Sequence, residues 1–192
     1  MTEALVTALA AALAGRQRTV LAPPGKRVAA VLVPLLAVEG EPSLLFTRRS
    51  NLLPHHQGQI AFPGGVHDPD ADPDLAATAL REAREEIGLD PTHVRLLGPL
   101  DDLETVATRF VITPFVGVVP HPYEFQPCPD EVDLIFTVPL GRLASPDALR
   151  RELWDFGGRQ VPIDVYAVDR HVIWGATQRI TGNLLAVLDE LA

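Results

Sequence analysis

The chain has 192 residues, 47% of them hydrophobic, and a formal net charge of −9 at pH 7. This length can supply one well-buried core, so we expect a single domain over residues 1–192, in which residues 1–27 form an N-terminal helix and lead-in. The charge argues against a nonspecific nucleic-acid surface, because polyanions would be repelled, and no apolar run reaches the length of a membrane span. One cysteine, Cys128, permits no internal disulfide, which fits a cytoplasmic location.

The predicted elements alternate between helices and strands. Residues 1–13 are Ala- and Leu-rich, carry Glu3 and lack a basic leader, so they read as an amphipathic helix rather than a signal peptide. Apolar, β-rich runs predict strands at residues 29–38, 44–48, 60–62, 94–100, 110–119 and 134–139, and a late hairpin at residues 161–168 and 171–174. Further helices are expected at residues 75–87, 145–152 and 177–191. Residues 120–129, dense in breakers, are interpreted as a loop near a functional site.

The helix at residues 75–87 is the most informative of these elements. Asp74 supplies an N-cap and Gly88 a C-terminal stop. Three carboxylates fall within an arc of roughly 100° on one of its faces, because steps of one, three and four residues relate them: Glu82, Glu85 and Glu86. They border the apolar stripe of the helix rather than oppose it, so we expect them to be partly desolvated.

An acidic helix face is ordinarily a solvated surface, but its position beside the apolar stripe favours a divalent-metal site here. Carboxylates held this close repel each other unless a cation lies among them, and hard oxygen ligands suit Mg²⁺ or Mn²⁺. We therefore predict that Glu82, Glu85 and Glu86 are metal ligands. Arg81 projects beside them and could pair with Glu85 one turn on, so we expect it to orient a glutamate rather than touch a substrate.

The segment from Arg81 to Leu89 resembles the second half of the signature of the Nudix hydrolases. The first half of that signature does not fit. The expected glycine falls at His67 and the expected glutamate at Pro73, whereas the Gly-Gly pair of this chain ends at Gly65. We infer that the loop before the helix is two residues longer than usual and that the usual loop glutamate is absent.

The chain also resembles one subfamily, the coenzyme A pyrophosphatases, over about residues 28–190. Within that subfamily's pattern Pro54 stands where a second arginine is expected, which leaves one phosphate or nucleotide contact without its usual residue. The matching segments are residues 44–50, 58–65, 68, 72, 79–83, 100–101, 111–114, 128–132, 136–140 and 172–177.

The resemblance implies a fold and an activity. The fold would be α/β, a Nudix-type α/β/α sandwich with a mixed central sheet. The activity would be metal-dependent hydrolysis of the pyrophosphate of coenzyme A and its derivatives to 4′-phosphopantetheine and adenosine 3′,5′-bisphosphate. One alternative is another nucleoside diphosphate derivative, such as ADP-ribose or a dinucleotide. Another is a non-catalytic coenzyme A or nucleotide sensor, which the intact set of three glutamates disfavours. We expect a small-molecule substrate and no nucleic-acid or membrane partner, while a homodimer stays open.

Catalytic roles follow from what a pyrophosphate needs, namely charge neutralisation, an oriented water and a base. The resemblance assigns metal ligation most firmly to Glu82 and Glu86. The base is either Glu85 or Glu131, since related enzymes often carry it on a loop outside the motif. Arg81 completes the predicted catalytic set.

Substrate contacts are predicted upstream of the loop that precedes the helix. Gly64 and Gly65 predict a tight turn, a close approach of the backbone to phosphate, or both. Arg48 or Arg49 is the expected donor to the 3′-phosphate of coenzyme A, because arginine makes charge-assisted, bidentate bonds to such a group. A second donor is expected from the preceding basic pair, Lys26 and Arg27.

Overall fold

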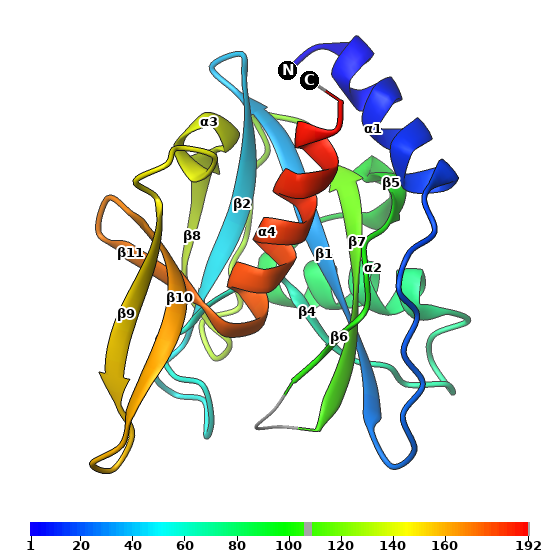
Figure 1. Ribbon diagram of the computed structural model, residues 1–192. Coiled ribbons are helices and arrows are strands. Elements are labelled where there is room, and N and C mark those ends of the chain that lie inside the picture. The colour runs from blue at the N-terminus through cyan, green and yellow to red at the C-terminus, as the bar shows by residue number, and fades with distance from the viewer. Residues whose placement is uncertain (106–108, 192) are drawn as a thin grey trace.

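A computed structural model describes residues 1–105 and 109–191 (Figure 1). Its larger sheet contains β1 (Arg27–Val38), β2 (Glu41–Arg49), β3 (Ile60–Ala61), β4 (Gly64–Val66), β5 (Arg95–Pro99), β6 (Leu103–Glu104), β7 (Phe110–Val118) and β8 (Val132–Pro139). The strand order is β3-β2-β1-β7-β5, and β4, β6 and β8 pair with β1, β7 and β2. The sheet is mixed, as predicted, because β1 and β7 are parallel and the other pairs are antiparallel.

Two neighbouring strands of this sheet separate toward one end. β1 and β2 pair directly only near their connection, from Leu35 opposite Leu44 to Val38 opposite Glu41. Farther along, β2 pairs with β3 and β1 pairs with β4. Residues 60–66 therefore cross from β2 to β1 and place the two glycines of β4 where the strands diverge.

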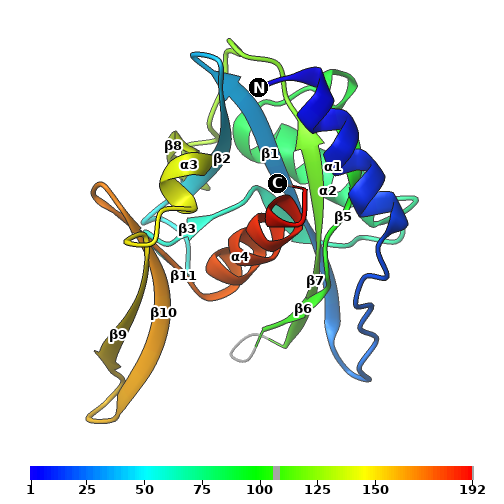
Figure 2. The same cartoon turned by 45° about the horizontal axis from the view of Figure 1, so that its top comes forward.

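Helices cover both faces of the sheet, as the predicted α/β/α sandwich requires. α4 (Gly175–Asp189) lies in front of the sheet and α2 (Leu75–Ile87) lies behind it, while α1 (Glu3–Gly15) flanks α4 (Figures 1 and 2). Alternate residues of β1 divide between the two layers. Val33 and Leu35 pack in the core that contains α1 and α4, and Leu32 and Leu36 pack in the core that contains α2.

The predicted bounds of α2 are confirmed, together with both of its capping residues. The Asp74 carboxylate accepts a hydrogen bond of 2.8 Å from the amide of Ala77. Gly88 ends the helix in the left-handed region at φ 67°, which a residue with a side chain rarely adopts. The first and last helices were also predicted within a few residues of α1 and α4.

The last part of the chain contains one error of prediction. The hairpin expected there is confirmed as β10 (Gln160–Val168) and β11 (His171–Trp174). The short helix expected at residues 145–152 is wrong, because β9 (Leu149–Asp155) begins within that range and a helical turn, α3 (Leu140–Leu143), precedes it. Helix propensity is a weak prior, and pairing of β9 with β10 along its whole length overrides it. β9, β10 and β11 form a second sheet that projects beside the first (Figure 1).

The segment at residues 120–129 is a loop, as predicted, and it packs against the end of α2. The amide of Gln126 donates to the carbonyl of Ile87, and the amide of Cys128 donates to the carbonyl of Glu86, both at 2.9 Å. The short 3₁₀ turn at Pro91–His93 follows α2. Within the described residues, no helix is both long enough and apolar enough to cross a membrane.

Candidate functional site

The three glutamates of α2 differ in how far the protein covers them. Glu86 is 6% exposed, the side chain of Glu82 is 17% exposed, and that of Glu85 is 56% exposed. The cause is the position of each glutamate on the helix. Ala79, Ala83 and Ile87 of the apolar stripe are fully buried in the core that includes β1, and the glutamates border this stripe. The predicted desolvation is thus present at Glu82 and Glu86, whereas Glu85 lies at the surface.

The two glycines of β4 make room for this site. A Cβ atom on Gly65 would lie 2.4 Å from Oε1 of Glu82, and one on Gly64 would lie 2.4 Å from the carbonyl oxygen of Ala30. Both residues are paired with β1 as part of a strand, so the tight-turn interpretation is wrong. Close approach of this backbone to a phosphate stays a prediction. The space left by Gly65 is what allows the Glu82 carboxylate to lie against the strand.

Arg81 holds the outer glutamates in place. Its Nη1 donates to Oε1 of Glu82 at 2.9 Å and to Oε2 of Glu85 at 3.0 Å. Its Nε and Nη2 bind both oxygens of the buried Asp72 at 2.8 and 2.9 Å, a bidentate pair. The pairing with Glu85 was predicted, but Asp72 was missed as a partner. It stands one residue before Pro73, where the Nudix signature expects its loop glutamate.

Asp72 and Arg81 stabilise each other in their charged forms. The guanidinium of Arg81 keeps the pKa of the Asp72 carboxyl well below its usual range, and Thr78 supports this with a hydrogen bond of 2.9 Å to the same carboxylate. Reciprocally, Asp72 raises the pKa of Arg81. Arg81 therefore remains a fixed cation between Asp72 and the two outer glutamates.

Glu82 and Glu86 carry an electrostatic cost that a cation would relieve. Burial raises the pKa of the Glu86 carboxyl to about 8, and the neighbouring charge of Glu82 adds to the effect. Burial also raises the pKa of Glu82. Arg81 lowers this pKa, whereas the negative charges of Glu85 and Glu131 raise it. A buried carboxylate and a half-buried one, four residues apart on one helix face, suit a divalent cation that prefers hard oxygen ligands.

Mg²⁺ is commonly bound through one or two carboxylates, while water and substrate phosphate fill its other positions. The carboxylates of Glu82 and Glu86 are donors of this kind. Within residues 1–105 and 109–191, no three His, Cys, Asp or Glu side chains converge as a set of ligands.

The structure separates the two predicted phosphate contacts of β2. Arg49 lies on the α2 side, where its charge lowers the pKa of Glu86, and its buried Nε has no hydrogen-bond partner among the described residues. Arg48 points to the opposite face, because side chains alternate along a strand, and its Nε binds Oδ1 of Asp133 at 2.8 Å. Only Arg49 is thus brought to the glutamates, and it carries a free donor there.

Glu131 belongs to the same site although it is distant in sequence. Its amide donates to the carbonyl of Cys128 at 3.0 Å, and its carbonyl accepts from the amide of Ser50 at 2.8 Å. These bonds fix it between the loop that covers α2 and the end of β2. Its charge raises the pKa values of Glu82 and Glu86. Glu85 also raises the pKa of Glu82, so both predicted base candidates interact electrostatically with the site.

The predicted second donors have other partners in the protein. Lys26 Nζ lies 2.6 Å from Oε1 of Glu104. The guanidinium carbon of Arg27 lies 5.1 Å from the centre of the Phe110 ring. A role for either residue at a 3′-phosphate stays a prediction.

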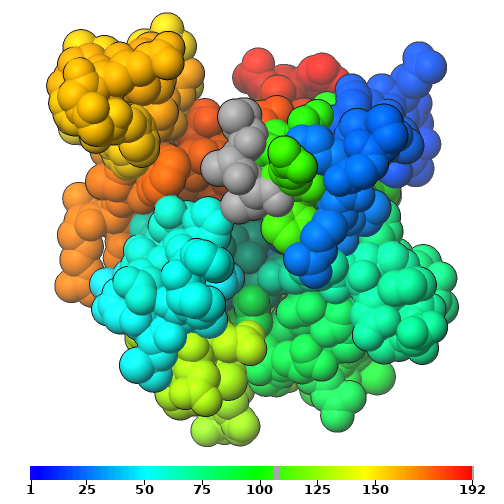
Figure 3. Space-filling view, turned by 90° about the horizontal axis from the view of Figure 1, so that it is seen from below, coloured from blue at the N-terminus to red at the C-terminus, as the bar shows by residue number. Residues whose placement is uncertain are grey.

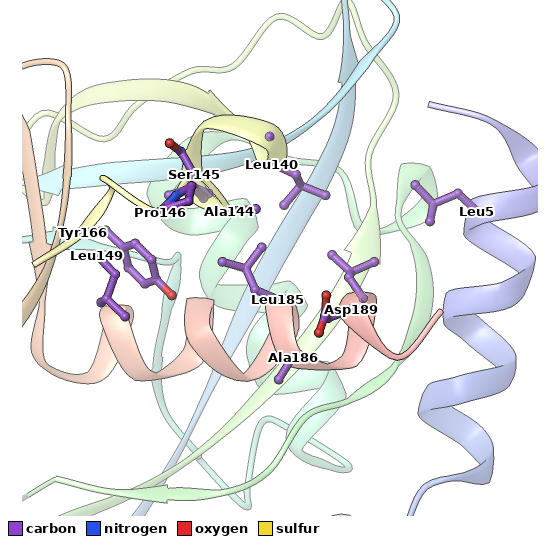
Figure 4. Close-up of a pocket in the computed structure, with 13 residues that line it drawn as sticks. Leu5, Leu140, Ala144, Ser145, Pro146, Leu149, Tyr166, Leu185, Ala186 and Asp189 are labelled. Carbon is purple, nitrogen blue, oxygen red and sulfur yellow. The ribbon is translucent and has the colours of Figure 1, made fainter. Parts of the chain in front are cut away.

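The site opens at the end of the molecule where β1 and β2 diverge. Figure 3 looks at this end and shows the surface hollowed between the cyan loop that joins β2 to β3 and the teal and green segments opposite. The cavity of about 700 Å³ shown in Figure 4 lies elsewhere, between α1, α3 and α4, and its lining includes several leucines, such as Leu140 and Leu185. No residue of α2 lines it, so the acidic cluster rather than this cavity marks the candidate site.

Replacing Glu86 with glutamine is expected to flatten the pH dependence of stability in the metal-free protein. A carboxyl with a pKa of about 8 in the folded protein, against an ordinary 4.5, binds its proton more tightly when folded. Wild-type stability therefore falls as pH rises through this window. At about pH 8 the variant should be more stable by roughly 1 to 3 kcal/mol, and near pH 5 the two should converge. Urea unfolding in EDTA measures this, and parallel pH profiles would contradict it.

Comparisons with known proteins agree with this geometry. A NUDIX domain model matches residues 25–156. Nudix hydrolase NudL of Photorhabdus laumondii, itself uncharacterized, is 40% identical over 170 residues, which cover 85% of this chain and 89% of that protein. NudL of Escherichia coli O1:K1, likewise uncharacterized, is 40% identical over 170 residues, with 86% and 81% covered.

Solved structures share the fold. A NUDIX hydrolase from Alicyclobacillus acidocaldarius has a TM-score of 0.56 at 23% identity, with 86% of this chain and 93% of that chain covered. A C. elegans Ap4A hydrolase binary complex has a TM-score of 0.50 at 21% identity, with 60% and 81% covered. At these identities the likeness concerns the fold alone. The domain match and the 40% identical relatives show more than the fold: this chain is a Nudix hydrolase, and thus an enzyme.

Proposed function

We propose that the enzyme hydrolyses the pyrophosphate of coenzyme A and its derivatives, yielding 4′-phosphopantetheine and adenosine 3′,5′-bisphosphate. One observation carries the reaction type: the buried carboxylate of Glu86, one helical turn from the half-buried Glu82, lies near the charge of Arg49, whose buried Nε has no partner among the described residues. Anionic ligands for a metal and a free cationic donor side by side suit a metal-bound pyrophosphate. Nudix hydrolases in general need divalent metal ions, typically Mg²⁺ or Mn²⁺.

The choice of coenzyme A rests on the subfamily resemblance. Its strongest segments, residues 44–50 and 58–65, form β2, β3 and β4, which are the strands that carry Arg48, Arg49 and the two glycines. The C. elegans neighbour is an Ap4A hydrolase, so a dinucleotide is the same-class alternative for this chain, and ADP-ribose is another.

The side chains divide the work of hydrolysis. Glu82 and Glu86 would hold the metal, with Glu85 as a third ligand where it does not serve as the base, and the metal would neutralise phosphate oxygens and lower the pKa of water. Arg49 donates to a phosphate oxygen. Arg81, fixed by its acid partners, positions Glu82 and Glu85. Either Glu85 or Glu131 accepts the proton of the attacking water as its oxygen bonds to phosphorus and the bridging P–O bond breaks.

A substrate panel tests this proposal. Coenzyme A, its 3′-dephospho form, ADP-ribose and a diadenosine polyphosphate are incubated with Mg²⁺ or Mn²⁺, and the products are identified by mass. Coenzyme A should give the two named products with the highest kcat/KM. Arg49→Ala should lower kcat/KM by the same factor for coenzyme A and its 3′-dephospho form, by about 1 to 3 kcal/mol in activation free energy, because Arg49 lies at the pyrophosphate.

Other outcomes would reject the proposal in distinct ways. A higher kcat/KM for ADP-ribose or the dinucleotide moves the assignment to another nucleoside diphosphate derivative. Binding of coenzyme A without cleavage under either metal assigns a sensor. Loss confined to coenzyme A in Arg49→Ala would show that Arg49 reads the 3′-phosphate rather than the pyrophosphate.

A further inference from the structure

A second pocket lies on the opposite face of β2 from the glutamates. Its volume is about 380 Å³, and it is open to solvent between the end of the larger sheet and the second sheet. We call it the tryptophan pocket and define it by five of its lining residues: Arg48, Trp154, Arg170, His171 and Trp174. They come from β2, β9, the turn after β10, and β11, so only the folded chain brings them together.

Aromatic rings held by their neighbours form one wall of the tryptophan pocket. The rings of Trp154 and Trp174 meet edge to face with centroids 5.1 Å apart. Trp154 Nε1 donates to Glu152 at 2.7 Å, and the His171 ring stacks on Phe136 at 3.8 Å. Rings fixed in this way offer a low-entropy platform on which a nucleobase can stack.

Two cations face the same wall. Arg48 uses its Nε for Asp133, and no other hydrogen bond of its guanidinium is found in the described part of the chain. Arg170 is exposed in the turn between β10 and β11 and forms no ion pair with any described residue. Burial lowers the pKa of His171, and the positive charges of Arg170 and Arg48 lower it further, whereas the charge of Asp169 raises it. Two guanidinium groups with uncommitted nitrogens at an aromatic wall match a phosphate ester on an aromatic nucleoside.

We propose that the tryptophan pocket binds a phosphorylated nucleoside, with the base against Trp154 and Trp174 and the phosphate between Arg48 and Arg170. The choice of adenosine 3′,5′-bisphosphate as its ligand rests on the proposed function, since this is the nucleotide half of coenzyme A. The ligand has two sources: the nucleotide end of the bound substrate, or the free nucleotide. If the ligand is the nucleotide end of the bound substrate, two consecutive residues bind two phosphate groups of one molecule. Arg48 then binds the 3′-phosphate, and Arg49 binds the pyrophosphate.

The two tryptophans of the chain both line this pocket, so intrinsic fluorescence reports on it directly. Adenosine 3′,5′-bisphosphate is titrated into wild-type protein in EDTA, with excitation at the red edge of tryptophan absorption. Saturable quenching is expected, weaker with AMP and absent with 4′-phosphopantetheine. Arg170→Ala should raise the Kd by about 10-fold or more. Trp154→Phe and Trp174→Phe assign the signal to each ring.

The matched control is Arg159→Ala, which removes the same charge from an exposed position outside the pocket. Its Kd should equal that of the wild type. Absence of saturable quenching, or equal Kd values for Arg170→Ala and Arg159→Ala, overturns the proposal. Because the titrated nucleotide has no pyrophosphate to cleave, this result is independent of whether coenzyme A is the substrate.

Steady-state kinetics then distinguish the two sources of the ligand. If the pocket holds the nucleotide end of the substrate, Arg170→Ala lowers kcat/KM for coenzyme A by about 10-fold and leaves that for 3′-dephospho-coenzyme A unchanged. If it holds free nucleotide, Arg170→Ala weakens the fluorescence titration and leaves both kcat/KM values unchanged. Either result supports a nucleotide site and says which molecule fills it.

Discussion

Glu82→Gln and Glu86→Gln are each expected to reduce turnover by a factor on the order of 10² or more without unfolding the protein. Glutamine keeps the shape of the side chain but removes the negative charge that a divalent cation needs. At Glu86, which is 6% exposed, the change also removes a charge that burial disfavours. The variant should therefore combine lost activity with equal or greater stability.

Turnover at saturating substrate and Mn²⁺ affinity by calorimetry measure this effect, and circular dichroism verifies the fold. Glu190→Gln, at an exposed position after α4, is the matched control and should behave as wild type. Near wild-type turnover and metal affinity in either active-site variant would remove that residue from the ligand set.

Gly65→Ala should also reduce turnover, by a factor on the order of 10², while leaving the fold largely intact. The new Cβ would lie 2.4 Å from the carboxylate of Glu82, at the far end of a flexible side chain. That side chain can swing away at little cost to folding, but it then leaves its position beside Arg81. The effect should fall on kcat and on metal affinity rather than on thermal stability.

Two other glycine substitutions separate this effect from general disruption. Gly64→Ala would place its Cβ 2.4 Å from a backbone carbonyl and 2.6 Å from the Cα of Val31, so it should lower stability by about 1 to 3 kcal/mol. Gly141→Ala, with nothing within 4 Å, should change neither property. If Gly65→Ala turns over like the Gly141 variant, the close packing of Glu82 on β4 has no part in catalysis.

The features that depend on short stretches of chain were predictable. The bounds of α2 follow from its apolar period, the carboxylate of Asp74 and the glycine at position 88, all within one segment. The pairing of Arg81 with Glu85 follows from their separation of one helical turn. The error at residues 145–152 has the opposite cause, because β9 exists through its partner strand rather than through its own residues.

The sequence by itself determined which chemistry this protein presents: three carboxylates on one helix face, an arginine beside them, and Gly64 and Gly65 upstream. Local geometry suffices for that, since the 3.6-residue period places Glu82, Glu85 and Glu86 together wherever the helix packs.

Only the tertiary structure decided how these groups differ. Burial against β1 separates Glu82 and Glu86 from the exposed Glu85, and the alternation of β2 sends Arg48 and Arg49 to opposite faces. Trp154 and Trp174 line one pocket with Arg48, although more than 100 positions of the chain separate them from it. Burial and such contacts depend on how distant segments pack, and no local pattern carries that information.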